Sequence, residues 1–108
     1  FDQFNEKHWD GKLPPLEIVG SRAMEDLGMY ESPESDKEDV PEAYCITINI
    51  RDQNRNQQRR TLLHEMCHHA VFVSNKEKYF NGEMTWHGKV WRNEMRRVGF
   101  KGVITSRT

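Results

Sequence analysis

Two histidines and a glutamate stand within five consecutive residues of this chain, in the pentapeptide His64-Glu65-Met66-Cys67-His68. On an α-helix, residues four apart lie one above the other on the same face, so the imidazoles of His64 and His68 would reach a single metal ion. Glu65 would project about 100° away, at the rim of that face. Neutral imidazole is a good ligand for Zn2+, and three protein ligands leave one tetrahedral position for water. The spacing therefore predicts a zinc centre if the segment is helical.

The chemistry that such a centre supports is hydrolysis. Zinc lowers the pKa of a bound water from about 15.7 toward 7, and a nearby carboxylate can take its proton and later give it to a leaving amine. The pattern His-Glu-x-x-His is typical of metalloproteases in which the glutamate is the general base. We therefore predict an enzyme, a zinc metalloendopeptidase with one catalytic Zn2+ and with Glu65 as general base. The alternative is a polar helix with two solvated histidines and no metal.

A catalytic zinc needs a third protein ligand, for which the sequence offers few candidates. His69 lies about 100° around the helix from His68, toward the apolar side, which favours a packing role. His8 lies near the N-terminus in an aromatic setting. His87 stands where a second amphipathic helix begins, beside Gly88, which lets backbone approach closely. We predict His87 as the third ligand, and the alternative is an exposed histidine in the first turn of that helix.

The segment 57–74 has the pattern of an amphipathic helix. On the side opposite the two histidines, apolar residues recur at three- and four-residue spacing, namely Leu62, Met66, Ala70 and Val73. No Pro or Gly interrupts the run. One face is thus expected to pack on a core while the other presents the metal ligands. Cys67 borders the histidine face, and we interpret it as a small buried side chain.

The rest of the chain predicts short strands and two further helices around this one. We expect a helix over 2–9, strands near 16–23, 28–31 and 44–50, loops over 32–41 and 76–83, a helix that begins at 87, and a final strand or tail over 103–105. This order predicts an α+β fold. A small antiparallel sheet of three to four strands would pack against the zinc-binding helix, with one helix N-terminal and one C-terminal to them.

Length and composition suit a single domain over residues 1–108. With 35% hydrophobic and 31% charged residues, the chain is typical of soluble globular proteins. It contains no apolar run near the length of a membrane span and no secretory signal pattern. Two cysteines, Cys45 and Cys67, do not form the pattern of a disulfide framework. We expect a monomer without membrane contact in an intracellular compartment, cytoplasmic or, in a eukaryote, nuclear; the start at Phe1 is compatible with a domain excised from a longer chain.

Charge is distributed unevenly, although the net charge is only −1. Residues 25–42 hold eight acids against one Lys, whereas 51–60 and 89–107 are rich in Arg and Lys. A surface built from the two basic segments could contact the phosphates of DNA. The candidate residues are Arg92, Arg96 and Arg97. Trp86 could stack on unpaired bases of single-stranded DNA or form a wall of the cleft, and an ordinary solvated surface is the alternative.

Four blocks of the chain, taken in order, carry a further pattern. They are the segment 4–14 with its Gly-Lys-Leu-Pro connection, the strand 46–49, the helical segment 61–70, and His87-Gly88 followed by Trp91 and Met95. Together they resemble the SprT-like family of zinc metalloproteases, which is related to Spartan. The acidic segment 31–42 has no clear counterpart in that family, so the resemblance does not extend to the choice of substrate.

The resemblance implies roles for the residues that match the family's motifs. His64, His68 and His87 would bind zinc, and Glu65 would be the general base, as their chemistry had already indicated. The family role is the cleavage of proteins attached to or trapped on DNA, which would place the chain in DNA repair with proteins or peptides as substrates.

Two features of the function stay open at the level of sequence. A catalytically inactive, zinc-containing nucleic-acid-binding module would keep the three histidines but would not need Glu65. A peptidase would hold its substrate along a sheet edge, for which we predict the strand 44–50. The candidates for stabilising the oxyanion are Tyr44, His69 and Tyr79.

Overall fold

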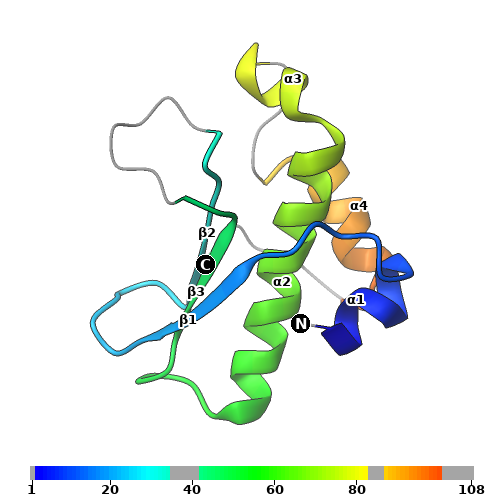
Figure 1. Cartoon of the computed structure of the whole chain (residues 1–108). Helices are drawn as coiled ribbons and strands as arrows, with labels where there is room; N and C mark the ends of the chain where they lie inside the picture. The colour runs from blue at the N-terminus through cyan, green and yellow to red at the C-terminus, as the bar shows by residue number, and fades with distance from the viewer. Residues whose placement is uncertain (1, 35–41, 83–86, 101–108) are drawn as a thin grey trace.

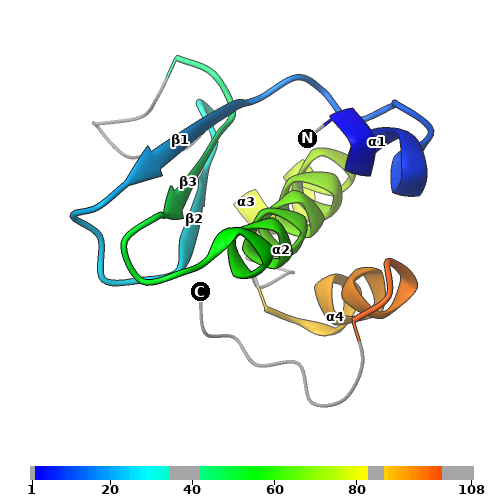
Figure 2. The same cartoon turned by 90° about the horizontal axis from the view of Figure 1, so that it is seen from below.

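A helix of 20 residues, α2 (Arg55–Ser74), runs through the middle of the molecule (Figure 1). The computed structural model describes residues 2–34, 42–82 and 87–100. The other elements are α1 (Asp2–Trp9), β1 (Glu17–Ser21), β2 (Gly28–Glu31), β3 (Cys45–Asn49), α3 (Lys76–Phe80) and α4 (Lys89–Arg97). Viewed along α2, the sheet lies on one side of this helix, and α1 and α4 lie on the other (Figure 2). The predicted α+β fold, with helices at both ends of the order, is confirmed.

The sheet has three strands in the order β1-β3-β2. β2 pairs antiparallel with β3, as predicted, with Tyr30 opposite Ile46. β1, however, pairs parallel with β3, with Ile18 beside Ile46, so the sheet is mixed and the prediction of a fully antiparallel sheet was wrong in this respect. The short connection between β1 and β2 suits a hairpin, but β3 inserts between these two strands.

Side chains at the end of β3 hold the connection 22–27 across the sheet. The buried amide of Asn49 donates to the backbone oxygens of Met24 at 3.3 Å and Asp26 at 3.1 Å. The guanidinium of Arg51 donates to the backbone oxygens of Arg22 and Met24, both at 3.1 Å. These bonds fix the connection against the end of β3, which lies between β1 and β2.

The start of α2 is fixed by a capping box. The side chain of Asn54 accepts a hydrogen bond from the backbone N–H of Gln57, and the side chain of Gln57 accepts one from the backbone N–H of Asn54, both at 2.9 Å. These bonds satisfy donors that a helix N-terminus leaves unpaired. The helix therefore begins at Arg55, two residues before the predicted segment.

Both faces of α2 are buried, in two separate clusters. The cluster on the sheet side contains Leu13, Ile46, Ile48, Met66 and Ala70. The cluster on the α4 side contains Cys67, Trp91, Met95 and Val98. Met66 and Ala70 belong to the predicted apolar stripe, whereas Leu62 and Val73 are only partly buried. Cys67 is fully buried, and neither of the two cysteines forms a disulfide.

The predicted loop over 76–83 contains the short helix α3, which corrects that prediction. Asn75 ends α2 and donates its backbone N–H to the Phe72 oxygen at 3.1 Å, and the chain turns into a new helix at Lys76. The expected turn at Asn81-Gly82 follows it. The predicted strand or tail at 103–105 and most of the predicted loop over 32–41 lie outside the described residues. Among the helices that the structure describes, none is long and apolar enough to cross a membrane.

Candidate metal centre

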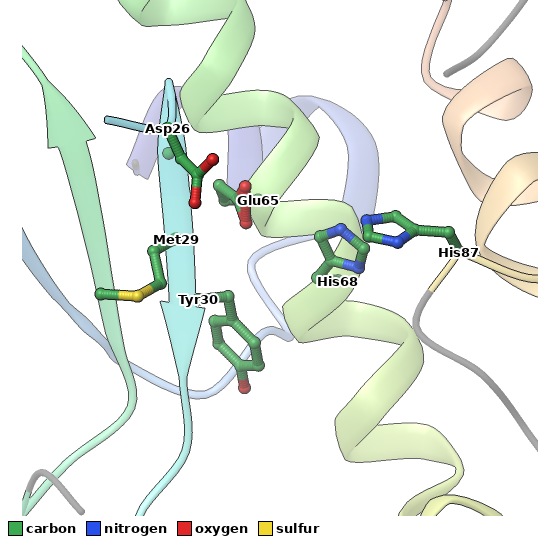
Figure 3. Close-up of a pocket in the computed structure, with 7 residues that line it drawn as sticks. Asp26, Met29, Tyr30, Glu65, His68 and His87 are labelled. Atoms are coloured by element: carbon green, nitrogen blue, oxygen red, sulfur yellow. The ribbon is translucent and has the colours of Figure 1, made fainter. Parts of the chain in front are cut away.

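Three histidine side chains converge between α2 and the residues that lead into α4. His64, His68 and His87 each offer a ring nitrogen, and these nitrogens lie within 4.8 Å of one another. The ring centroids of His64 and His68 are 5.3 Å apart, and those of His68 and His87 are 4.9 Å apart. Figure 3 shows His68 projecting from α2 toward His87, which comes from the opposite side. This proximity would allow the three rings to hold one metal ion, for which neutral imidazoles are suitable ligands.

Burial keeps these imidazoles in the neutral form that binds metals. Together with the neighbouring histidines, it lowers the pKa of His64 to about 4 and that of His68 to about 2. The pKa of His87 is lowered by burial and by the charge of Arg92. A neutral imidazole has a free lone pair on one nitrogen, so no proton competes with a cation for these rings at neutral pH.

Glu65 lies beside the histidines with only 1% of its surface exposed. Burial and, to a smaller extent, the charge of Asp26 raise the pKa of its carboxyl to about 8. Within the described residues, Glu65 Oε1 and His87 Nε2 are buried polar atoms without a hydrogen-bond partner. A cation with its water would satisfy both atoms and would favour the ionised carboxylate, so the residues fit a bound zinc ion.

The pocket over this centre has a volume of about 220 Å³. It is lined by Asp26, Gly28, Met29, Tyr30, Glu65, His68 and His87 (Figure 3). The first four come from β2 and the residue pair before it, and the sequence patterns did not identify them. Gly28 could have been singled out as a glycine inside a strand, because such a residue often marks a close approach of another element.

Tyr30 connects the pocket wall to the buried His69. The Tyr30 hydroxyl lies 2.6 Å from His69 Nδ1, and His69 Nε2 lies 2.9 Å from the Pro14 carbonyl oxygen. Because a carbonyl only accepts, Nε2 carries the proton and Nδ1 accepts from the hydroxyl. The predicted packing role of His69 is confirmed. Its proposed role as oxyanion donor is wrong, because both ring nitrogens are engaged inside the protein.

The strand that we predicted to hold substrate is not an edge strand. β3 lies between β1 and β2, so both of its edges are paired and it cannot accept a further strand. β2 pairs only with β3 in the described part of the chain, and its residues line the pocket. Tyr44 and Tyr79, the other two oxyanion candidates, are not among the residues that line this pocket.

The predicted DNA-contacting residues are not among those that line the pocket. Arg92, Arg96 and Arg97 are exposed on α4. Arg97 forms an ion pair with Glu94, and its guanidinium lies 5.6 Å from the centre of the Trp9 ring. The guanidinium of Arg60 lies 5.7 Å from the centre of the Phe100 ring, which brings the basic start of α2 to the end of α4. Trp86 lies outside the described residues.

The fold and the centre together define a class of protein. A buried helix carries two histidines one turn apart and a glutamate between them, and a third histidine approaches from the next segment, which is a metalloprotease-type arrangement. Comparison with protein-family models matches the SprT-like family over residues 1–108, so the chain belongs to this family. The resemblance drawn from the sequence blocks is thereby confirmed. Searches of the curated proteins and of the solved structures gave no match.

Proposed function

We propose that this chain is a zinc-dependent metalloendopeptidase, with residues 1–108 forming its catalytic domain. The observation that carries the proposal is the convergence of His64, His68 and His87 beside the buried carboxylate of Glu65. Membership of the SprT-like family supports the same reading. In this proposal the three histidines hold one Zn2+, and Glu65 is the general base.

The roles follow from the position of each group. Zinc, when bound, supplies a Lewis acid that polarises the scissile carbonyl and acidifies a water molecule. Glu65 takes the proton of the attacking water and transfers it to the nitrogen of the departing amine. Its burial keeps bulk water away from the carboxylate, so the proton stays within the site during the reaction.

The edge of β2 provides a binding surface for an extended substrate. Gly28, Met29 and Tyr30 line the pocket, and the outer edge of β2 carries no strand in the described residues. A peptide added along this edge would pair with the strand backbone and pass beside Glu65. We therefore propose β2, in place of the strand first predicted, as the substrate-binding edge.

Replacing Glu65 with glutamine tests the proposed reaction directly. The amide keeps the size of the side chain but cannot take a proton, so cleavage of a denatured protein substrate should be abolished while zinc content stays near one ion per chain. His87→Ala should instead remove the metal, which elemental analysis measures. If zinc-loaded wild-type protein cleaves no substrate, or Glu65→Gln retains full activity, the peptidase proposal fails and a zinc-containing nucleic-acid-binding module becomes the better description.

DNA is the partner that we propose for the basic surface, which would direct the enzyme to DNA-associated or DNA-crosslinked proteins. The exposed arginines of α4 and the approach of Arg60 to the end of this helix support a continuous basic patch. Binding to single-stranded DNA should weaken with salt, because each neutralised phosphate releases counterions. Neutralising Arg92, Arg96 and Arg97 together should weaken binding and reduce the salt dependence. Binding that is insensitive to both changes would contradict this part of the proposal.

A further inference from the structure

We propose that Trp91 is a positioning residue for the metal centre, whose indole ring fixes the orientation of all three zinc-binding imidazoles. The inference rests on the proposed zinc site and adds to it a residue that belongs to neither the ligand set nor the general base. Trp91 lies in the first turns of α4, four residues after His87, and its side chain is fully buried.

The indole contacts each of the three histidine rings. Its ring centroid lies 4.9 Å from His64, 4.8 Å from His68 and 4.9 Å from His87. The ring of His68 is stacked on it with an interplanar angle of 4°. The other two rings meet it edge to face, at 61° for His64 and 79° for His87. These are the preferred geometries of aromatic pairs.

Such contacts restrict the rotation on which metal binding depends. A histidine side chain binds metal only when its ring turns a nitrogen lone pair toward the ion, and the torsion that turns the ring is otherwise broad. Ligating histidines are usually oriented by groups around them, whose loss weakens metal binding. One rigid ring packed against three imidazoles would restrict all three torsions at once, so the ligand set would be arranged before the metal arrives.

The nitrogen of the indole argues that Trp91 does more than fill the core. Trp91 Nε1 is buried and has no hydrogen-bond partner within the described residues. An unpaired buried N–H destabilises a fold, and phenylalanine would fill much of the same space without it. Core packing alone therefore does not account for an indole at this position, whereas contact with three rings requires its larger flat surface.

The chain offers a matched control in Trp9. Trp9 packs against the same buried cluster as Trp91, and its indole donates to Glu94 at 3.3 Å. Its ring lies 5.8 Å from that of His8, which is outside the proposed ligand set. Trp9→Phe and Trp9→Leu thus remove the same side-chain atoms as the corresponding Trp91 substitutions. They also remove the hydrogen bond to Glu94, but they do not change a residue of the proposed ligand set.

The experiment compares zinc affinity in folded protein, measured by competition with a chromogenic chelator. Trp91→Leu should weaken zinc binding about tenfold or more, Trp91→Phe should have a smaller effect, and both Trp9 variants should stay within about twofold of wild type. The visible absorption of bound Co2+ should shift in the Trp91 variants alone, because it reports ligand geometry. Circular dichroism identifies folded variants, and Trp91→Phe carries the test if Trp91→Leu does not fold.

The outcomes separate this inference from the proposed function. If folded Trp91 variants match their Trp9 counterparts in zinc affinity and in the Co2+ spectrum, Trp91 is a core residue only and the inference is wrong, while the peptidase proposal stands. If the wild-type protein binds no zinc, the proposed function falls first and the inference falls with it.

Discussion

Gly28 lets the pocket-lining strand β2 approach α2 at the proposed general base. A Cβ atom built at this residue would lie 2.6 Å from Thr61 Cγ2 and 3.1 Å from Glu65 Cγ. The first distance is shorter than real Cβ contacts allow, and both neighbours belong to a buried helix. The width of the pocket beside Glu65 is therefore set by the absence of a side chain at position 28.

Replacing Gly28 with alanine should affect both stability and activity. The added methyl must push β2 away from α2 or displace the side chains of Thr61 and Glu65, and overpacking of this kind costs about 1–3 kcal/mol of unfolding free energy. We also expect a lower kcat, because Glu65 is displaced from its position beside the histidines. Urea denaturation and peptidase assays measure the two effects.

Gly20→Ala is the matched control for this change. Its Cβ would lie 3.1 Å from the Ile50 side chain, which is exposed enough to move. The Gly20 variant should therefore lose less stability and keep its activity. Equal losses of stability and activity in both variants would show that they arise from replacing a glycine in a strand, and not from the contact between Gly28 and α2.

Among individual residues, the sequence predicted the site residues that could be recognised from their place within a helix. His64, Glu65 and His68 follow from spacing within a single helix, and His87 follows from its place at the start of another helix. Asp26 and Gly28 could not be found in this way, because they reach the site only through the pairing of β2 with β3. Pairing between separate segments is not encoded in the periodicity of either one.

At the scale of elements, a partly buried hydrogen bond ties β2 to α2. The Tyr30 hydroxyl donates to His69 Nδ1, and the other nitrogen of the same ring donates to the Pro14 carbonyl oxygen. Three segments that are distant in the sequence thus meet at His69, which has no exposed surface. The bond fixes the position of the pocket-lining strand along α2.

Tyr30→Phe should weaken this link without affecting the proposed metal ligands. The change leaves His69 Nδ1 buried and unpaired, which costs about 1–3 kcal/mol of unfolding free energy. Zinc affinity should stay at the wild-type value, since Tyr30 is not a proposed ligand, whereas KM for a peptide should rise because β2 is less firmly held. Denaturation, chelator competition and steady-state kinetics separate the three quantities.

Tyr44→Phe provides the comparison for the Tyr30 variant. The Tyr44 ring also packs on His69, with centroids 4.9 Å apart, but its hydroxyl interacts with Lys76, a residue that is only partly buried. Loss of this hydroxyl should cost clearly less stability than loss of the Tyr30 hydroxyl. If the Tyr44 variant is as unstable as the Tyr30 variant, the hydrogen bond from Tyr30 to His69 contributes no more to the free energy of unfolding than the Tyr44 hydroxyl does.

The elements themselves were largely predictable, whereas their pairing was not. The bounds predicted for α1 and β2 agree with the structure, since caps, turns and alternation are local signals. The start of α2 was missed although Asn54 and Gln57 carry a capping signal. The parallel pairing of β1 with β3 joins segments that are distant in the sequence, and Asn49 and Arg51 bond to the connection between β1 and β2.

At the scale of the whole molecule, the buried ionisable groups oppose one another in their effect on stability. His64 and His68 have lowered pKa values, so below pH 6.5 the unfolded chain takes up protons that the folded one does not, and stability falls as pH falls toward 4. Glu65 has a raised pKa of about 8 against an ordinary 4.5, so stability falls as pH rises through that interval. Between pH 4.5 and 6.5 the two histidines outweigh the single glutamate.

The metal-free protein should therefore be most stable near pH 6.5, the ordinary pKa of histidine. Chemical denaturation with a chelator present, at acidic, intermediate and alkaline pH, measures the profile. Glu65→Gln removes the group that opposes the histidines, so its stability should no longer fall between pH 6.5 and 8, while the acidic loss becomes steeper. Zinc binds the folded state alone and should raise stability most on the alkaline side, where the carboxylate of Glu65 is ionised and attracts the cation. A maximum that stays in place in the Glu65 variant would contradict the assignment of the alkaline loss to this buried carboxyl.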